Sequence, residues 1–324
     1  MADCHKIFLE FNSIIELKPK RKASLRTSRD AVREIIRDYF REKNNGFFPK
    51  FHGQGSFMMN TIIYPLDGEF DIDDGIYFFV EQEPAHSIDT FHRWICEATD
   101  GHTKQKPIDK QTCVRVVYAG QYHLDLPIYY IVKGNCPRLA HKSKGWIESD
   151  PRKFIKWFQG QTDDKGQLRR IVRYLKAWSD YKAGELPSGL ILSILATRNI
   201  RYDARDDIAL YNTLSNIKSW LELSFTCYRP TTPSYEDLLQ NYSQTDKYYF
   251  KSQLASLIRS AEKALDDKTS LEDACKEWQK HFGDRFPCQL AEDKADNLLS
   301  AAFAAPNLTF PNRPIIPNKP GGFA

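Results

Sequence analysis

The sequence predicts an α+β protein with two lobes, a sheet-containing N-terminal lobe followed by a helical C-terminal lobe. Up to about residue 150, short runs rich in β-branched and aromatic residues, which are typical of strands, are interrupted by helical patterns. Beyond Pro151, apolar residues recur almost throughout at helical spacing. A length of 324 residues suits two lobes that share a cleft.

The N-terminal lobe is expected to be a sheet with helices packed against it. Between Ser28 and Lys43, apolar residues recur every three or four positions behind a Ser/Asp start signal, which predicts an amphipathic helix. Strands are predicted in "TIIY", "GIYFFV", "TCVRVVYA" and "YHLDLPIYYIV", with a helix in "SIDTFHRWICEA". We therefore assign residues 1–150 to this lobe.

Six further segments predict the helices of the second lobe, which we assign to residues 151–304. They are "RKFIKWFQ", "QLRRIVRYLKAW", "SGLILSILATR", "DIALYNTLSNIKSWLEL", "KYYFKSQLASLIRSAEKAL" and "SLEDACKEWQKHF". Residues 305–324 contain five prolines and no acidic residue, which predicts a flexible, proline-rich tail.

Composition excludes several classes of protein. The net charge is only +4 and hydrophobic residues make up 41%, so neither a nucleic-acid scaffold nor a disordered chain is expected. The basic run Lys18–Lys22 is small and is interpreted as a solvated linker rather than a nucleic-acid site. No secretion signal and no apolar run of membrane-spanning length occurs, which predicts a soluble, cytoplasmic protein.

The cysteines predict neither disulfides nor zinc. Seven of them are scattered along the chain without any Cys-x-x-Cys pair, which argues against a disulfide framework and against a zinc site. We expect most of them to be reduced packing residues.

Chemistry is indicated by the acidic string "DIDDG". On a strand, Asp71 and Asp73 share one face, while Asp74 falls on the other and receives no ligand role. Asp125 supplies a third acid from another predicted strand. Three such carboxylates suit a two-magnesium site for nucleotidyl transfer, in which one cation activates a hydroxyl and the other holds the triphosphate.

Two blander interpretations compete with this one. Taken alone, an Asp-x-Asp-Asp-Gly string is as typical of a solvated turn as of a metal site. A calcium loop is excluded, because Ile76 and Gln82 stand where that loop requires glycine and glutamate.

A glycine-serine segment, "GQGSF", precedes the acids. Gly53 and Gly55 allow backbone N–H groups to approach a phosphate, and Ser56 adds a hydroxyl donor. The segment has neither the third glycine of a dinucleotide fingerprint nor a Walker lysine. Such a segment is often only a turn, and its position ahead of the acids favours a phosphate-binding role.

The order of these motifs resembles a known family. "QGSF", "DIDDGIYF", "TCVRV", "YHLDLPIYY" and "LRRIVRYLKAW" together look like the DNA polymerase β-type nucleotidyltransferases. Within them they resemble the bacterial cyclic-oligonucleotide synthases related to animal cyclic GMP-AMP synthase and oligoadenylate synthetase. The resemblance covers most of residues 50–200 and implies a polymerase β-type fold with its active site in the cleft between the lobes.

The resemblance also implies roles for individual residues. Gly55 and Ser56 would hold the donor triphosphate, and Gln54 beside them is predicted to bind nucleotide. Asp71, Asp73 and Asp125 would be the catalytic residues and would bind two Mg²⁺ ions, for which Mn²⁺ can substitute.

A second group of candidates lies on and after the "LRRIVRYLKAW" helix. Arg169, Arg173 and Lys176 form a basic column along a flank of its apolar face, where they either overlook a cleft or face solvent. The lysine resembles the family's triphosphate-binding lysine. Ser188 occupies the place of a phosphate- or base-contacting serine, and it equally suits a helix cap.

The function implied by the resemblance is synthesis of a cyclic oligonucleotide second messenger, favoured as 3′,3′-cyclic GMP-AMP, from ATP and GTP with release of pyrophosphate. Its context would be antiphage signalling through a downstream effector that binds the product. The alternatives are a linear oligonucleotide or tRNA-terminal nucleotidyltransferase, and a catalytically silent nucleotide-binding module. Ala324 after Gly-Gly-Phe resembles the substrate of a ubiquitin-activating-like enzyme, a possible partner.

Overall fold

In the described part of the chain, seven strands form one mixed sheet. The computed structural model describes residues 2–43, 46–119, 122–182, 186–289 and 291, so the predicted tail with Ala324 lies outside the described residues. The strands are β1 Pro49–Gly53, β2 Asp71–Val80, β3 Ile108–Asp109, β4 Cys113–Tyr118, β5 Tyr122–Val132, β6 Arg138–His141 and β7 Gly145–Glu148. Their order is β1-β2-β5-β4-β3, and β6 pairs with both β5 and β7.

The central pair of this sheet is β2 and β5, which run parallel, whereas the other strand pairs are antiparallel. Their register sets Asp73 opposite Asp125 and Asp71 opposite His123. Two acids that are far apart in sequence are therefore neighbours across adjacent strands, which lie about 4.8 Å apart.

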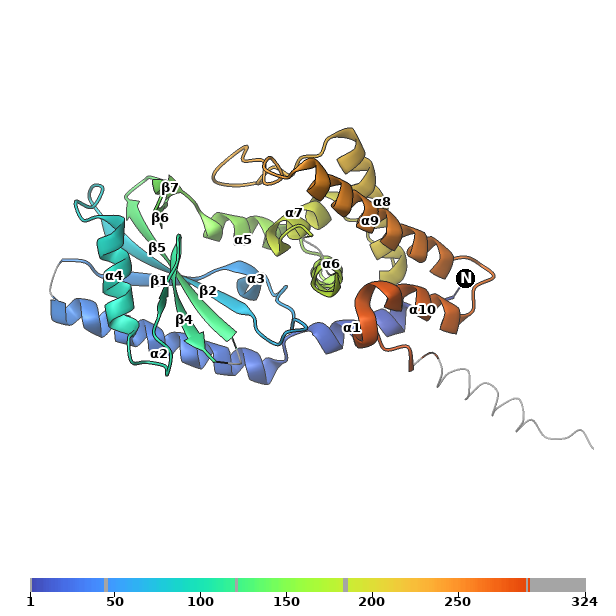
Figure 1. Cartoon of the computed structure of the whole chain (residues 1–324), viewed down its shortest axis with the longest axis horizontal. Helices are drawn as coiled ribbons and strands as arrows, with labels where there is room; N and C mark the ends of the chain where they lie inside the picture. Colours follow the sequence, from blue (N-terminus) through green and yellow to red (C-terminus); the bar gives the residue numbers. More distant parts are fainter. Residues whose placement is uncertain (1, 44–45, 120–121, 183–185, 290, 292–324) are drawn as a thin grey trace, which may run out of the picture.

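One face of the sheet is covered by two helices, α2 (Pro19–Lys43) and α4 (Ile88–Thr99) (Figure 1). The even-numbered residues of β2 and β5 face these helices, and Ile72, Ile76 and Leu124 are buried there in one apolar core. Because side chains alternate along a strand, the odd-numbered residues face the opposite side. That side carries Asp71, Asp73 and Asp125.

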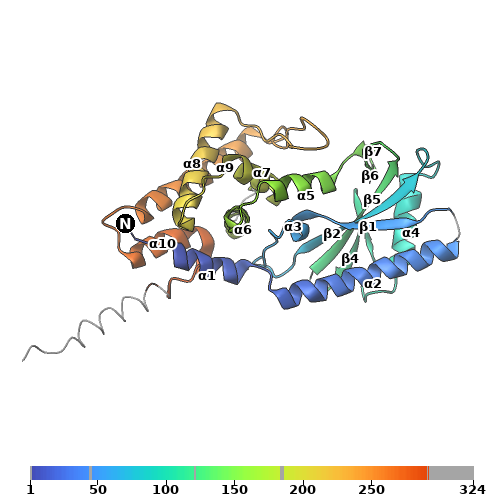
Figure 2. The same ribbon diagram turned by 180° about the vertical axis from the view of Figure 1, so that it is seen from behind.

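A second core is built by the helical part of the chain. Its helices are α1 His5–Ile15, α5 Pro151–Gly160, α6 Gln167–Tyr181, α7 Gly189–Asn199, α8 Asp206–Leu223, α9 Gln244–Ala264 and α10 Leu271–Phe282, followed by the 3₁₀ turn η1 Gly283–Arg285. Figure 2 shows α5 leading from the β7 end of the sheet towards the helices around α6. None of the helices in these described ranges is long and apolar enough to cross a membrane.

The first helix departs from the predicted lobe boundary. Phe8 and Phe11 of α1 pack in the second core, where Phe8 contacts the rings of Tyr174 and Trp278 at centroid distances of 5.0 Å. The assignment of the whole of residues 1–150 to the sheet lobe is therefore wrong for α1. Its apolar residues find their partners on α6 and α10, so this helix belongs to the helical core.

Three local predictions also need correction. The predicted Ser28–Lys43 helix begins at Pro19, so most of the Lys18–Lys22 run is helical rather than a linker. The "TIIY" segment is not a strand, and only Ile63 forms an isolated bridge, with Glu16. Gly55 and Ser56 of the predicted glycine-serine turn are the first two residues of a short helix, α3 (Gly55–Met58).

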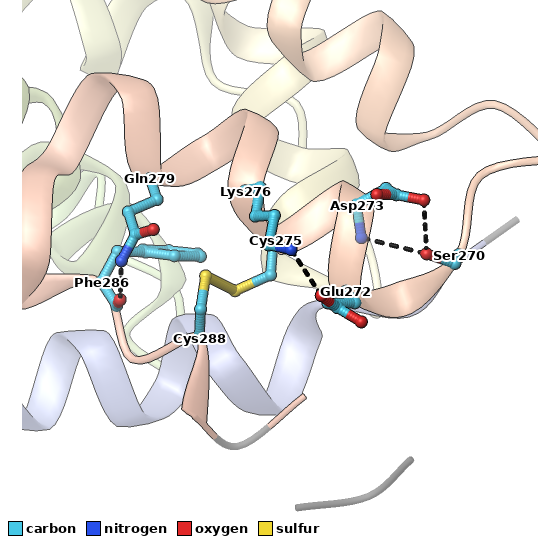
Figure 3. Close-up of a disulfide and its surroundings, with 8 residues drawn as sticks. All are labelled: Ser270, Glu272, Asp273, Cys275, Lys276, Gln279, Phe286 and Cys288. Atoms are coloured by element: carbon cyan, nitrogen blue, oxygen red, sulfur yellow. Dashed lines mark hydrogen bonds and ion pairs between the residues drawn. A yellow bond between two sulfur atoms is a disulfide. The ribbon is translucent and has the colours of Figure 1, made fainter. Parts of the chain in front are cut away.

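Two cysteines form a disulfide, contrary to the prediction for these residues. Cys275 of α10 is bonded to Cys288, which lies just after η1, with their Cα atoms 5.6 Å apart (Figure 3). The two cysteines are 13 positions apart in the sequence, and the chain reversal through η1 brings their buried side chains together. Spacing alone could not reveal this pairing, because no Cys-x-x-Cys pattern accompanies it.

Candidate active site

The three predicted acids lie on the side of the central strand pair that faces away from α2 and α4. Asp71 and Asp73 belong to β2 and Asp125 to β5, all at odd-numbered positions. Asp74, by contrast, is buried under α2, where Arg33 binds both of its oxygens, at 2.7 and 2.5 Å. The alternation predicted from the sequence is confirmed, and it separates the structural acid from the three candidates.

An arginine that the sequence prediction gave no role lies among these acids. Arg115 of β4 donates to both oxygens of Asp125, at 2.7 and 2.8 Å, and its Nη2 lies 2.9 Å from Asp71. It reaches both carboxylates because it pairs directly with Asp125 in the β4–β5 ladder. Only that strand register could have identified it, since "TCVRVVY" alone does not show which acid it faces.

The central acid, Asp73, is poorly neutralised. Burial, followed by the neighbouring carboxylates of Asp125 and Asp71, raises the pKa of its carboxyl to about 6, although Lys176 and Arg115 act in the opposite direction. No hydrogen-bond partner is found for its carboxylate among the residues that the structure describes. A carboxylate held in this way gains from a cation beside it.

The donor set fits magnesium by its chemistry, because hard divalent cations prefer carboxylate oxygens. The acids are not already gathered as a metal site: among the described residues no group of three such ligands is close enough to hold an ion. Arg115 instead bridges Asp125 and Asp71. Binding of magnesium by these acids would therefore require Arg115 to give up contacts with Asp125, both of whose oxygens it holds, as well as with Asp71.

The predicted phosphate-binding turn lies directly against Asp73. Gly55 has a φ of +64°, and a Cβ atom there would fall 2.0 Å from an oxygen of the Asp73 carboxylate. Glycine is thus required twice, by the backbone conformation and by the close approach. The backbone N–H of Gln54 also donates to the Asp73 carbonyl at 2.8 Å, which fixes the turn to the strand that carries the acids.

Gln54 lines one of the two cavities described below, so its predicted contact with nucleotide stays a prediction, while its side-chain amide is held within the sheet. Its buried side chain donates to the Tyr77 hydroxyl at 2.7 Å and accepts from the Tyr129 hydroxyl at 3.2 Å. The two tyrosine rings stack with centroids 4.6 Å apart. Gly75 leaves the room for this amide, since a Cβ there would lie 1.9 Å from the Gln54 nitrogen. Gln54 therefore anchors the turn to β2 and β5.

Of the basic column on α6, one residue faces the acids. Lys176 donates to the Thr61 carbonyl at 3.1 Å, and burial lowers its pKa to about 8 although Asp73 acts in the opposite direction. Arg173 is buried and bonded to Asn12 and to the carbonyl of residue 60, at 2.6 and 2.8 Å. Arg169 bonds Thr162 instead. Of the two alternatives left open for this column, the cleft does not hold for either arginine, and Arg173 is buried rather than facing solvent.

Two cavities meet at this place. The first cavity has a volume of about 370 Å³ and the second of about 620 Å³. Both are lined by Ser56, Asp73, Lys176, Gly189 and Leu190. The second cavity is also lined by Asp71 and Ser188, which stands at the cap position of α7 but makes no capping hydrogen bond with its side chain. Two ligands in these cavities would thus meet at Asp73, whereas Asp125 lines neither cavity.

Comparison with known proteins connects this geometry to a family. Residues 49–129 match the family model described as "Cyclic GMP-AMP synthase DncV-like, nucleotidyltransferase domain". The cyclic GMP-AMP synthase of Escherichia albertii is 28% identical over 203 residues, which cover 57% of this chain and 45% of that protein. A cyclic AMP-AMP-AMP synthase of an Acinetobacter species is 24% identical over 202 residues, covering 55% and 56%. The chain spans about half the length of the curated relatives it matches.

Solved structures share the fold over nearly the whole chain. Vibrio cholerae DncV, described as a cyclic AMP-GMP synthase and a prokaryotic cGAS homolog, superposes with a TM-score of 0.76 at 21% identity, covering 90% of this chain and 99% of that one. Its complex with the linear intermediate 5′ pppA(3′,5′)pG gives 0.76 at 20% identity, covering 89% and 97%. The predicted α+β fold of the polymerase β type is thereby confirmed.

The matched domain contains Gly55, Ser56 and the three acids, and the resemblance first indicated by their order in the sequence is confirmed. Residues 49–129 therefore resemble the nucleotidyltransferase domain of the DncV-like cyclic GMP-AMP synthases, and the chain shares the fold of the DncV structures.

Proposed function

We propose that this protein is a nucleotidyltransferase that joins ATP and GTP and closes the product into a cyclic oligonucleotide, favoured as 3′,3′-cyclic GMP-AMP. The observation that carries the proposal is the meeting of two cavities at Ser56, Asp73 and Lys176. A transfer between two nucleotides needs two binding sites that share one reacting centre. The names of the relatives, which include cyclic GMP-AMP and cyclic AMP-AMP-AMP synthases, support a cyclic product.

The chain's own residues supply most of what the transfer needs. Gly55 lets backbone N–H groups approach the triphosphate, and the Ser56 hydroxyl adds a donor to it. Lys176 contributes a positive charge to the lining of both cavities, and Ser188 lines the second cavity, where the attacking nucleotide would lie. Holding both nucleotides beside the acids converts the reaction into an effectively unimolecular step.

Asp71, Asp73 and Asp125 would hold two magnesium ions, or manganese in their place. These ions would supply the Lewis-acid chemistry that eases deprotonation of the attacking hydroxyl and neutralises the departing pyrophosphate. The raised pKa of Asp73 supports this assignment, because the carboxylate lies among like charges and has little neutralisation of its own.

The proposal is tested by incubating the purified protein with the four labelled NTPs, singly and in pairs, with magnesium, and identifying products by mass spectrometry. We expect pyrophosphate release with ATP plus GTP and a product that resists phosphatase, because a ring has no terminal phosphate. A phosphatase-sensitive product would replace the proposal by a linear or tRNA-terminal transferase. Bound nucleotide without any pyrophosphate release would indicate a silent module.

The cellular setting is a further part of the proposal. We place the enzyme in the cytoplasm, where both substrates are available, and its product with a downstream effector in antiphage signalling. Conjugation of Ala324 by a ubiquitin-activating-like enzyme stays a prediction. Replacing Ala324 with glutamate should abolish any conjugate and leave nucleotide synthesis intact, and an unchanged conjugate would refute this role of the tail.

A further inference from the structure

The first cavity has an apolar wall and a polar end that nothing above assigns to a ligand. Met59, Phe154, Ile155 and Leu190 provide apolar surface, as binding sites for flat organic groups commonly do. Ser149, Thr232 and Arg229 line the same cavity. Because its remaining lining includes Ser56, Asp73 and Lys176, a nucleotide with its phosphates at that group would have its base among these other residues.

Arg229 is held in a defined position by the segment between α8 and α9. Its backbone N–H donates to the Glu236 carbonyl at 2.8 Å, and Tyr228 forms a β-bridge with Asp237. Its side chain is fixed by the same residue, since Nε donates to a Glu236 carboxylate oxygen at 2.5 Å. Glu236 thus orients the guanidinium of Arg229 by accepting a hydrogen bond from its Nε atom.

The outer edge of this guanidinium is free for a ligand. No partner for its two terminal nitrogens is found within the described ranges of the chain, although the side chain is only 21% exposed. Arginine keeps its charge at any ordinary pH, so these nitrogens remain donors and cannot accept. Because Arg229 lines the first cavity, a ligand there that offers a pair of acceptors would match these two donors.

Guanine presents such a pair and adenine does not. The O6 and N7 atoms of guanine are adjacent acceptors that match an arginine, whereas adenine offers N7 beside the donor group N6–H₂. The hydroxyls of Ser149 and Thr232 adapt to either base because each can donate or accept. Arg229 is therefore the lining residue whose chemistry distinguishes the two purines.

We propose that Arg229 selects guanine in the first cavity, so that GTP is the nucleotide whose triphosphate lies against Gly55 and Ser56 and which donates its nucleotidyl group. This inference rests on the proposed function and names the base for one of its two sites. Glu236 acts as a positioning residue, because it orients Arg229 and lines neither cavity.

The first experiment isolates the donor role with 3′-deoxynucleotides, which lack the attacking hydroxyl and can only donate. With ATP as the common acceptor, we expect dinucleotide to form from 3′-deoxy-GTP about 10-fold or more faster than from 3′-deoxy-ATP, at subsaturating donor. 3′-Deoxy-ITP should behave like 3′-deoxy-GTP because it keeps O6 and N7. The 7-deaza analogue of 3′-deoxy-GTP should lose most of the advantage. Equal rates for guanine and adenine donors would overturn the proposal.

The second experiment replaces Arg229, the residue proposed to select the base. Arg229→Gln should reverse the preference towards 3′-deoxy-ATP, because glutamine pairs with N6 and N7 of adenine. Arg201→Gln is the matched control: it makes the same charge change on the exposed Arg201, and the guanine preference should persist. Glu236→Gln should reduce that preference without reversing it. A guanine-to-adenine ratio that Arg229→Gln leaves unchanged would refute the assignment, whatever the overall rate.

Failure of this inference can be told apart from failure of the proposed function. Equilibrium binding of GTP and ATP is measured alongside turnover, with thermal melting as the check on folding. If dinucleotide forms but its donor base ignores Arg229, only the base assignment falls. If the folded wild-type protein releases no pyrophosphate from any nucleotide pair, the proposed function falls and this inference falls with it.

Discussion

Two aspartates, Asp206 in the helical core and Asp73 beside the cavities, are treated in opposite ways by the structure. Asp206 is fully buried and accepts two hydrogen bonds from Arg170, at 2.6 and 2.8 Å, and one each from Tyr174 and Gln167 at 2.8 Å. Burial alone would raise its pKa, but these partners lower it below the ordinary value. For Asp73 the result is reversed, and its pKa rises to about 6.

These opposite pKa shifts distinguish an acid that stabilises the fold, Asp206, from an acid that is available to a ligand, Asp73. A buried carboxylate is tolerated when its hydrogen bonds are complete, as they are around Asp206. Asp73 is left facing two other carboxylates, with Lys176 bonded to Thr61 rather than to it. Such incomplete neutralisation costs free energy of folding and is characteristic of functional sites.

The largest effect should come from removing the charge of Asp73. We expect Asp73→Asn to lower kcat by roughly 10³-fold or more, because the reacting centre would lose the acid that lies against Gly55. Pyrophosphate release measures this loss. Asp164→Asn, a change at an exposed acid, is the control and should retain the wild-type rate. Retained synthesis in the Asp73 variant would end the assignment of this acid.

Asp206 should show the opposite pattern. Asp206→Ala is expected to destabilise the protein by about 3–5 kcal/mol, because Arg170, whose charge is partly buried, would lose its partner, and Tyr174 and Gln167 would each lose a buried hydrogen bond. Chemical denaturation measures the free energy of unfolding, and KM for the nucleotides should not change. Replacing Arg170 by methionine in the same variant should recover part of the loss. A loss of less than about 1 kcal/mol in the free energy of unfolding would contradict the structural role assigned to Asp206.

The same comparison predicts a gain in stability at Asp73. In metal-free buffer at pH 7.5, Asp73→Asn should be more stable than wild type by about 1–3 kcal/mol. The folded pKa of about 6 exceeds the unfolded value, so the wild type loses stability as pH rises from about 4 through 6, where the carboxylate ionises. The variant should therefore gain nothing at pH 4. An unchanged or lower stability at pH 7.5 would contradict the electrostatic argument.

The smallest expected effect concerns Lys176, the cation opposite Asp73. Its pKa is lowered to about 8, so the free enzyme loses this charge as pH rises above 8. We expect kcat/KM for the nucleotides to fall several-fold between pH 7 and 9, since this ratio reports groups of the free enzyme. Lys176→Arg keeps its charge over that range and should flatten the profile. If both proteins showed the same decline, another group would be responsible.

Much of the fold could be predicted because its elements are locally encoded. The run from Tyr122 to Val132 is a strand, as its alternating residues indicate, and the helices after Pro151 follow the apolar spacing closely. The helix α1 was not predicted, and its place in the second core depends on aromatic partners more than 160 residues away. The Cys275–Cys288 bond was missed for a related reason, since the chain reversal through η1 creates it.

The site was predictable to the same degree and for the same reason. Strand alternation alone separated Asp71 and Asp73 from Asp74, and the order of motifs indicated Gly55 and Ser56. The hydrogen-bond partners of the Gln54 and Arg115 side chains were not predictable, because they depend on which strand lies beside each residue. Arg229 joins the first cavity from a segment between α8 and α9 that contains no periodic pattern.

By itself, the sequence determined the kind of chemistry: three acids at defined strand positions, a glycine-serine turn before them and a family whose motifs occur in that order. Only the tertiary structure decided which charges meet. The parallel register of β2 and β5 sets Asp73 opposite Asp125, and the helical core brings Lys176 to face them. Electrostatic interactions depend on distance and burial in space, and neither is written in the spacing of residues along a chain.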